Sequence, residues 1–141
     1  MLCISKVKNP SLKNSRSGQR HLLHLIIQPH MTSFNLNLRG STHIAMNMLE
    51  ERCSDSLRSL DFVYNNNMPP HYYYSFFAKF KHLTKLNVTA SLVDDVAFRA
   101  IGETCSKLVE LNAGSTYITN VGIKYLSVED ALVPCISNQY R

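Results

Sequence analysis

The chain has 141 residues, of which 45% are hydrophobic, and it carries a net charge of +5. That length suffices for one domain with its own core, and the composition is ordinary for a globular protein. The longest apolar run near the N-terminus, Leu25 to Ile27, is far too short to cross a membrane. His21 and His24 interrupt the stretch that a signal peptide would need. We therefore expect no membrane span and a cytoplasmic or nuclear location.

Residues 1–30 form a basic N-terminal arm. Residues 1–49 contain six Lys or Arg and no acidic residue, whereas residues 50–141 contain nine basic and ten acidic residues. Such an arm is compatible with contact to nucleic acid, an acidic partner or an anionic membrane, with a transit peptide, or with a solvated tail. No dense Lys/Arg cluster with interleaved aromatic residues occurs, which argues against nucleic-acid binding. Within the arm, residues 21–28 predict the helix of a degenerate leading repeat.

Four later segments share the pattern LxxLxL, and each is expected to form a short strand. The first, residues 33–38, is a weak copy, and the stronger copies are residues 57–62, 83–88 and 108–113. Steps of 24, 26 and 25 residues separate their central leucines, within the period of 20–29 that is typical of leucine-rich repeats. These central positions are Leu36, Leu60, Leu86 and Leu111.

A small polar residue follows each predicted strand by three positions. There the chain turns inward, so a hydroxyl or amide can bond loop backbone that would otherwise be buried unpaired. The four residues are Ser41, Asn65, Ser91 and Thr116.

The second half of each repeat is expected to be a helix with one apolar face. Asp94 or Asp95 can cap the third helix, and Thr119 or Asn120 the fourth. In the second repeat, residues 65–70 are expected to form a loop before the helix. The predicted buried positions are, in chain order, Ile44, Met48 and Leu49; Phe76, Phe77 and Phe80; Val96, Ala97, Ala100 and Ile101; and Val121, Ile123 and Leu126.

The predicted fold class is therefore α/β: an open leucine-rich-repeat solenoid, a right-handed βα superhelix of about four repeats over residues 31–127. Residues 128–141 are expected to form a C-terminal edge strand or tail. Val133 and Ile136 lie one period beyond the fourth repeat, and Pro134 is tolerated at a sheet edge. Neither end has the polar character of a capping repeat, which favours a fragment or isoform of a longer solenoid.

The third and fourth repeats resemble the cysteine-containing subclass of leucine-rich repeats. Residues 93–113 carry Cys105 at the end of the predicted helix, and residues 117–126 are similar to the subclass hallmark I-T-D-x-G-L-x-x-L. Asn120 replaces the Asp of that hallmark, and Ile123 replaces the first Leu. The resemblance extends over residues 31–127 and is loose before Leu57.

This subclass is typical of F-box/LRR proteins, the substrate receptors of SCF ubiquitin ligases. The resemblance implies repeats that hold a protein partner or substrate, with SCF components as further partners in a longer form. The N-terminal thirty residues are too few and too basic for an F-box, so ligase activity is not expected of this chain alone. The alternatives are a general scaffold or adaptor without a ubiquitin role, and a nucleic-acid or membrane binder acting through the basic arm.

Catalytic and metal-binding motifs are missing from the sequence. The four cysteines form no CxxC or CxxH pair, the six histidines lack partners at ligand spacing, and no GxSxG, GxGxxG or P-loop occurs. We therefore expect no enzyme, no cofactor, no metal and no small-molecule ligand. Cys53 and Cys105, both at predicted helix ends, are expected to be reduced and buried as small apolar residues. The sequon at Asn87 lies inside a predicted strand and is expected to be unused.

The partner-binding face is expected to be the concave side of the sheet. Because side chains alternate along a strand, the positions between the buried leucines point away from the core and line up into rows across stacked strands. The residues expected to contact a partner are Asp61, Lys85, Asn87, Glu110 and Asn112. Two alternatives stay open: these residues only keep the sheet solvated, or a partner contacts Tyr72, Tyr73 and Tyr74.

Overall fold

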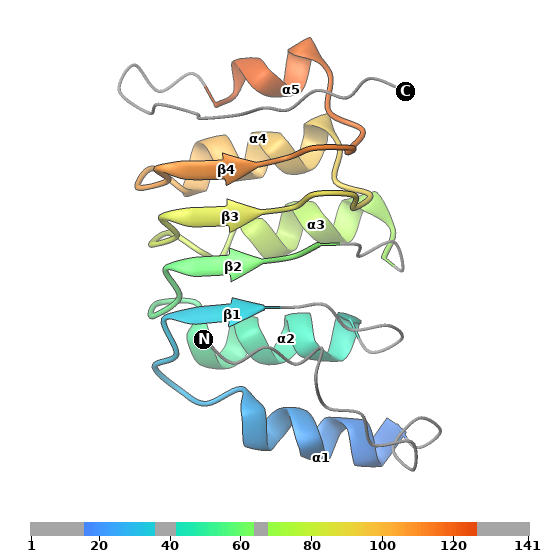
Figure 1. Ribbon diagram of the computed structural model, residues 1–141, viewed down its shortest axis with the longest axis vertical. Coiled ribbons are helices and arrows are strands. Elements are labelled where there is room, and N and C mark those ends of the chain that lie inside the picture. Colours follow the sequence, from blue (N-terminus) through green and yellow to red (C-terminus); the bar gives the residue numbers. More distant parts are fainter. Residues whose placement is uncertain (1–15, 36–41, 64–67, 127–141) are drawn as a thin grey trace.

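The structure is a computed structural model that describes residues 16–35, 42–63 and 68–126 (Figure 1). Strands and helices alternate along the described chain, as the sequence predicts. The elements are α1 (Arg16–Ile26), β1 (Ser33–Asn35), α2 (Thr42–Cys53), β2 (Ser59–Asp61), α3 (Pro70–Phe77), β3 (Lys85–Asn87), α4 (Asp95–Thr104), β4 (Glu110–Asn112) and α5 (Asn120–Lys124).

The four strands form an open parallel sheet in the order β1-β2-β3-β4. Figure 1 shows the strands stacked in one layer, with α2, α3 and α4 stacked in a second layer behind them. Hydrogen bonds continue the ladder beyond the strands. Thr32 O, Arg58 O and Thr84 O each accept from two successive amides of the following unit. The fold is therefore α/β, with each strand next to the strand that follows it in the chain.

The register of β1 differs from the prediction. Phe34 pairs with Leu60, Leu60 with Leu86, and Leu86 with Leu111, so the steps are 26, 26 and 25 residues. The predicted central residue, Leu36, lies outside the described residues. Phe34 fills the same core position as the leucines because a buried aromatic ring supplies at least as much apolar surface. The observed register is shifted by two residues from the predicted one. Because side chains alternate with a period of two, such a shift does not exchange the buried and exposed faces of the strand.

Aromatic side chains fill the core of the second unit. The ring of Phe62, directly after β2, lies 5.6 Å from that of Tyr73, 6.0 Å from Phe76 and 6.1 Å from Phe77. The first and third of these contacts are edge-on, the arrangement that ring quadrupoles favour. Phe76, Phe77 and Phe80 are buried as predicted. Tyr73 is buried as well, although the sequence suggested an exposed cluster of Tyr72, Tyr73 and Tyr74.

Two predicted core positions are wrong. Val96 and Val121 are each 55% exposed, whereas Phe98, which the prediction leaves out, is buried. The reason is where each helix begins. Asp94 caps α4 by accepting from Ala97 N at 3.0 Å, so the first turn presents Val96 outward and brings residues 97 and 98 onto the core. Val121 occupies the corresponding first turn of α5.

The turns after β3 and β4 confirm the expected role of the small polar residues. Ser91 Oγ donates to Val88 O at 2.6 Å, and Thr116 Oγ1 donates to Ala113 O at 2.8 Å. The residue before each, Ala90 and Ser115, has a positive φ of 53° and 55° respectively. The two turns therefore share one conformation and one hydrogen bond. Ser41 and Asn65 lie outside the described residues.

The two described cysteines link successive units. Cys53 Sγ donates to Gln28 O and Cys105 Sγ donates to Phe80 O, each at 3.3 Å and across 25 residues of sequence. Both thiols are free and buried, which confirms the packing prediction. Burial also raises their pKa, that of Cys105 to about 12. Cys3 and Cys135 lie outside the described residues.

The last described helix is anchored by a carboxylate of the helix before it. Asp95 accepts from Thr119 N at 2.7 Å, Thr119 Oγ1 at 2.6 Å and Gly122 N at 3.0 Å. Thr119 in turn caps α5 by accepting from Val121 N at 3.2 Å. Of the predicted capping alternatives, Asp94 and Thr119 are therefore the caps, while Asp95 joins two units.

The predicted end segments are described only in part. Helix α1 begins at Arg16 and includes the leading helix that the sequence predicts from His21 onwards. Its C-terminal end is bonded by the next unit, because Arg52 Nη1 donates to His24 O at 3.3 Å and to Ile27 O, directly after the helix, at 2.6 Å. The predicted edge strand at 133–136 lies outside the described residues. In the described part of the chain, every helix is too short or too polar to span a membrane.

A candidate partner-binding face on the sheet

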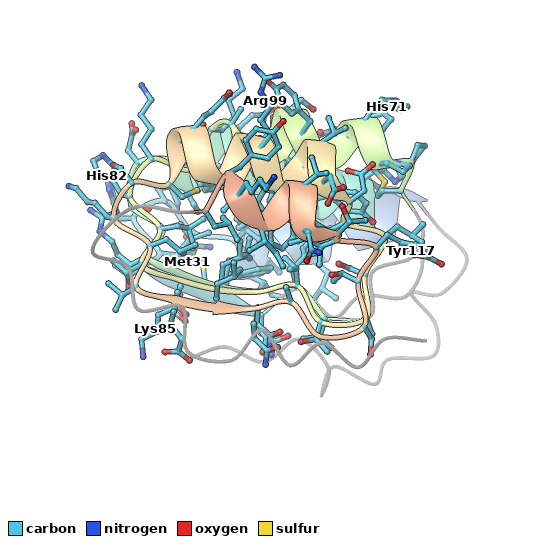
Figure 2. All side chains as sticks on the ribbon, turned by 90° about the horizontal axis from the view of Figure 1, so that it is seen from above. Met31, His71, His82, Lys85, Arg99 and Tyr117 are labelled. Atoms are coloured by element: carbon cyan, nitrogen blue, oxygen red, sulfur yellow. The ribbon has the colours of Figure 1, made fainter. Side chains whose placement is uncertain are left out.

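The five predicted contact residues lie together on the sheet face that points away from the helices. Lys85 pairs with Glu110 in the register of the strands, and Asp61 with Asn87 and then Asn112. Figure 2 shows Lys85 projecting from the strands on the side opposite the helices. The five contact residues belong to two rows that run across the strands. We call them the charged row (Ser33, Ser59, Lys85, Glu110) and the amide row (Asn35, Asp61, Asn87, Asn112).

The amide row begins at a residue that the sequence reading placed elsewhere. Centring the first strand on Leu36, as the sequence pattern does, would put Asn37 beside Asp61, whereas the observed register of β1 puts Asn35 there. Asn35 Nδ2 donates to Asp61 Oδ2 at 3.3 Å. Asn37 lies outside the described residues. The equal steps of 26 residues from Phe34 to Leu60 and from Leu60 to Leu86 are the signal that could have corrected the register.

The charged row neutralises itself. Lys85 Nζ lies 3.1 Å from Glu110 Oε2, and the two side chains are 62% and 57% exposed. An exposed pair of this kind contributes only about 0–1 kcal/mol to stability. The main consequence of this ion pair is that Lys85 and Glu110 neutralise each other's charge, while both side chains remain accessible to a binding partner.

The asparagines of β3 and β4 are held in a fixed orientation. Asn87 Oδ1 accepts from Thr89 N at 3.1 Å and from Thr89 Oγ1 at 2.7 Å. Asn112 Oδ1 accepts from Gly114 N at 3.3 Å and lies 2.9 Å from Thr89 Oγ1, whose one hydroxyl proton is shared between the two asparagine oxygens. Both carbonyl ends are therefore occupied, and within the described residues neither Nδ2 group donates to the protein. Thr89 links the two side chains, a role that the sequence reading did not assign to it.

Asp61 is the only described side chain with a buried polar atom that lacks a hydrogen-bond partner. Its Oδ2 accepts from Asn35, whereas its Oδ1 is buried and unpaired. Burial raises the pKa of this carboxyl above its ordinary value of 3.8. An unsatisfied buried acceptor is costly, so this carboxylate is held in the polar row at a cost to stability.

The alternative tyrosine surface does not act as one unit. Tyr72 and Tyr74 of α3 are 46% and 38% exposed, but Tyr73 is fully buried between them. Helix α3 lies in the helical layer, on the opposite side of the sheet from the two rows (Figure 1). A partner at the tyrosines would therefore leave the charged row and the amide row untouched.

The sheet face offers hydrogen bonds and charge. Within residues 16–35, 42–63 and 68–126, no group of three or more His, Cys, Asp or Glu side chains is placed to hold a metal ion. Comparison of the chain with family models, with curated proteins and with solved structures finds no match. What distinguishes this face among the described residues is therefore its two polar rows.

Proposed function

We propose that the chain is a short leucine-rich-repeat solenoid that binds another protein through its open sheet face and carries out no catalysis. The observation that carries the proposal is the pair of polar rows, which bring Asp61, Lys85, Asn87, Glu110 and Asn112 onto one face across successive strands. A repeated strand holds such rows rigid, and rigid rows of hydrogen-bonding side chains suit recognition of an extended surface.

Three features support the finer assignment to the cysteine-containing subclass. The strand step of 25–26 residues fits it, and each described cysteine bonds a carbonyl of the preceding unit. Gly122 of the I-T-D-x-G-L-like segment is buried. A Cβ added to Gly122 would collide with Asp95, whose Cα would lie 3.1 Å from it. On that basis the chain is related to the substrate-holding repeats of F-box/LRR receptors and acts in the cytoplasm or nucleus.

A pull-down with a charge-swapped variant tests the binding face. Lys85→Glu combined with Glu110→Lys reverses both charges but keeps the net charge and the ion pair, so the fold is retained. The matched control is Tyr72→Ser with Tyr74→Ser; Tyr73 stays unchanged because it is buried. We expect the charge swap to release the captured protein and the tyrosine variant to keep it. The opposite pattern would move the interface to α3.

The same pull-down separates the proposed class from its alternatives. Recovery of a ubiquitin-ligase adaptor and cullin with a longer form of the chain supports the receptor assignment. A partner held without them supports a general scaffold or adaptor. An interaction that disappears on adding salt and on removing residues 1–15 would favour the basic arm as a nucleic-acid or membrane binder.

A further inference from the structure

One edge of the stack is formed by the connections that lead from a helix into the following strand. Figure 2 shows His82 on this edge, on the opposite side of the molecule from Tyr117. The connections of the third and fourth units, residues 78–84 and 105–109, contain no acidic residue but four basic ones: Lys79, Lys81, His82 and Lys107. Lys79 interacts electrostatically with Glu50 of α2. We call the other three side chains the basic edge.

The lysines of the basic edge have no carboxylate to neutralise them. Glu103 and Glu110, the acidic residues that flank Lys107 in the sequence, are each paired with another cation. Within the described residues, neither Lys81 nor Lys107 forms an ion pair. Both side chains are exposed. Two accessible positive charges are therefore left for an anionic partner.

The histidine of the basic edge contacts the lysine of the next unit. Lys107 Nζ lies 3.3 Å from His82 Nδ1, across 25 residues of sequence. An ammonium group has no acceptor, so Lys107 donates and Nδ1 accepts. The ring proton of His82 is therefore on Nε2 in this contact. The pair then presents Nε2–H and the remaining ammonium hydrogens, which are all donors, and it suits a group that only accepts.

The surroundings of the basic edge favour a polypeptide over a nucleic acid. Val109 follows Lys107 by two residues, and its side chain is 64% exposed. Acidic side chains of a protein segment can reach the lysines while an apolar side chain covers Val109. Single-stranded nucleic acids bind through bases stacked on exposed aromatic side chains. In residues 78–84 and 105–109 the one Phe, Tyr or Trp is Phe80, and it is buried.

We infer that the basic edge binds an acidic polypeptide segment of a partner, whose carboxylates accept from Lys81, His82 Nε2 and Lys107 while an apolar side chain covers Val109. The inference goes beyond the proposed function, because it adds a surface outside the charged row and the amide row. The net charge of +5 attracts such a segment from a distance, and the basic edge determines where it docks.

The test is a fluorescence anisotropy titration of the full chain with a labelled peptide of repeated Glu-Glu-Val. We expect binding that weakens as salt is added, and little binding of the matched peptide of repeated Gln-Gln-Val. Lys81→Glu combined with Lys107→Glu should weaken binding by about tenfold, because two exposed attractions become repulsions. The same variant should gain affinity for a peptide of repeated Lys-Lys-Val. His82→Leu removes one donor and should weaken binding of the acidic peptide less.

The matched control is Lys6→Glu combined with Lys8→Glu, which lowers the net charge equally but changes the N-terminal arm. It should leave most of the affinity intact. An equal loss in both variants would show that net charge attracts the peptide without a defined site, which overturns the inference. Absence of binding at low salt would overturn it as well. Neither result bears on the sheet face, which the pull-down tests separately.

Two further probes identify a wrong surface or a wrong partner class. Lys85→Glu with Glu110→Lys reverses the charged row and should leave the affinity for the acidic peptide nearly unchanged. If this variant abolishes binding and the Lys81/Lys107 variant does not, the peptide lies on the sheet face. Oligouridine and phosphatidylserine vesicles should bind more weakly than the peptide. Tighter binding of either, lost in the Lys81/Lys107 variant, would make the basic edge a nucleic-acid or membrane site instead.

Discussion

Asp61 is a single side chain whose burial costs the fold stability. Its pKa is raised in the folded chain because burial disfavours the ionised form. The folded state therefore holds the proton more tightly than the unfolded state does. It follows that the carboxyl favours folding while protonated, and that this contribution is lost as the pH rises through the raised pKa.

The Asp61→Asn variant should therefore be more stable than the parent at pH 7. The asparagine keeps an oxygen for Asn35 Nδ2 and removes the buried charge. We expect a higher midpoint of thermal unfolding at pH 7, and a difference that shrinks as the pH falls through the raised pKa and is lost below 3.8, the ordinary value for this carboxyl. Circular dichroism melts across this pH range measure it, with Asp55→Asn as the exposed control. A lower midpoint at pH 7 would show that the carboxylate stabilises the fold.

The thiols of Cys53 and Cys105 give a second prediction for single residues. Only the thiolate reacts quickly with alkylating reagents, and burial both raises the pKa of Cys105 to about 12 and blocks access. We expect maleimide to label both cysteines slowly in the native chain at pH 7 and rapidly in denaturant, as read by mass spectrometry of peptides. Rapid native labelling of either would contradict their role as bonds between units.

Among the secondary-structure elements, α4 and α5 are joined through a glycine. A Cβ on Gly102 of α4 would collide with the backbone of Tyr125, whose carbonyl carbon lies at 2.7 Å. A backbone carbonyl cannot rotate away as a flexible side chain can. The two helices can therefore lie this close only if residue 102 has no side chain.

The Gly102→Ala variant separates this contact from helix propensity. In an open helix the change stabilises by about 1 kcal/mol. Here overpacking costs about 1–3 kcal/mol, so we expect a lower free energy of unfolding in urea. Glu103→Ala, the neighbouring control, removes only an exposed bond to Arg99 and should cost less than about 1 kcal/mol. A stabilised Gly102→Ala would mean that α5 is not held against α4.

The strands and helices could be predicted from the sequence wherever the repeated pattern allowed only one position for the strand. The copies at 57–62, 83–88 and 108–113 place Leu60, Leu86 and Leu111 in register, as observed. The first copy was misplaced because Leu36 and Leu38 fit the pattern as well as Phe34 does, and only pairing with β2 decides between them. Val96 was misassigned because helical spacing fixes which residues share a face, while the cap at Asp94 fixes which face turns inward.

The candidate site was predictable to the same degree. The period of two in a strand puts Asp61, Asn87 and Asn112 on one face without any knowledge of the fold. The hydrogen bonds of Thr89 and the unpaired oxygen of Asp61 depend on rotamers and on the turns after β3 and β4. A sequence pattern carries no information at that level, so the chemistry of the row emerges only with the structure.

At the scale of the whole molecule, the chain is a stack in which each unit contacts its neighbours. Each described strand pairs with the next one. Among the helices, the close contacts are between α3 and α4, between α4 and α5, and between α1 and α2. Helices α2 and α3 are not in comparably close contact. In such a stack stability is a sum of units and interfaces, so its parts can open separately. A compact domain of this size would instead unfold in one step.

Hydrogen exchange of a Leu49→Ala variant distinguishes these two descriptions. Leu49 of α2 is fully buried, so its truncation should cost about 2–5 kcal/mol. If the units open separately, hydrogen-exchange protection should fall in α1, β1 and α2, while β3, α4 and β4 keep theirs, because α2 and α3 approach each other less closely than α3 and α4. Asn47→Ala, exposed on the same helix, should change neither group of amides. An equal loss of protection in all the described strands and helices would show that the chain folds as a single cooperative unit. The sheet face and its polar rows would then unfold together with α2.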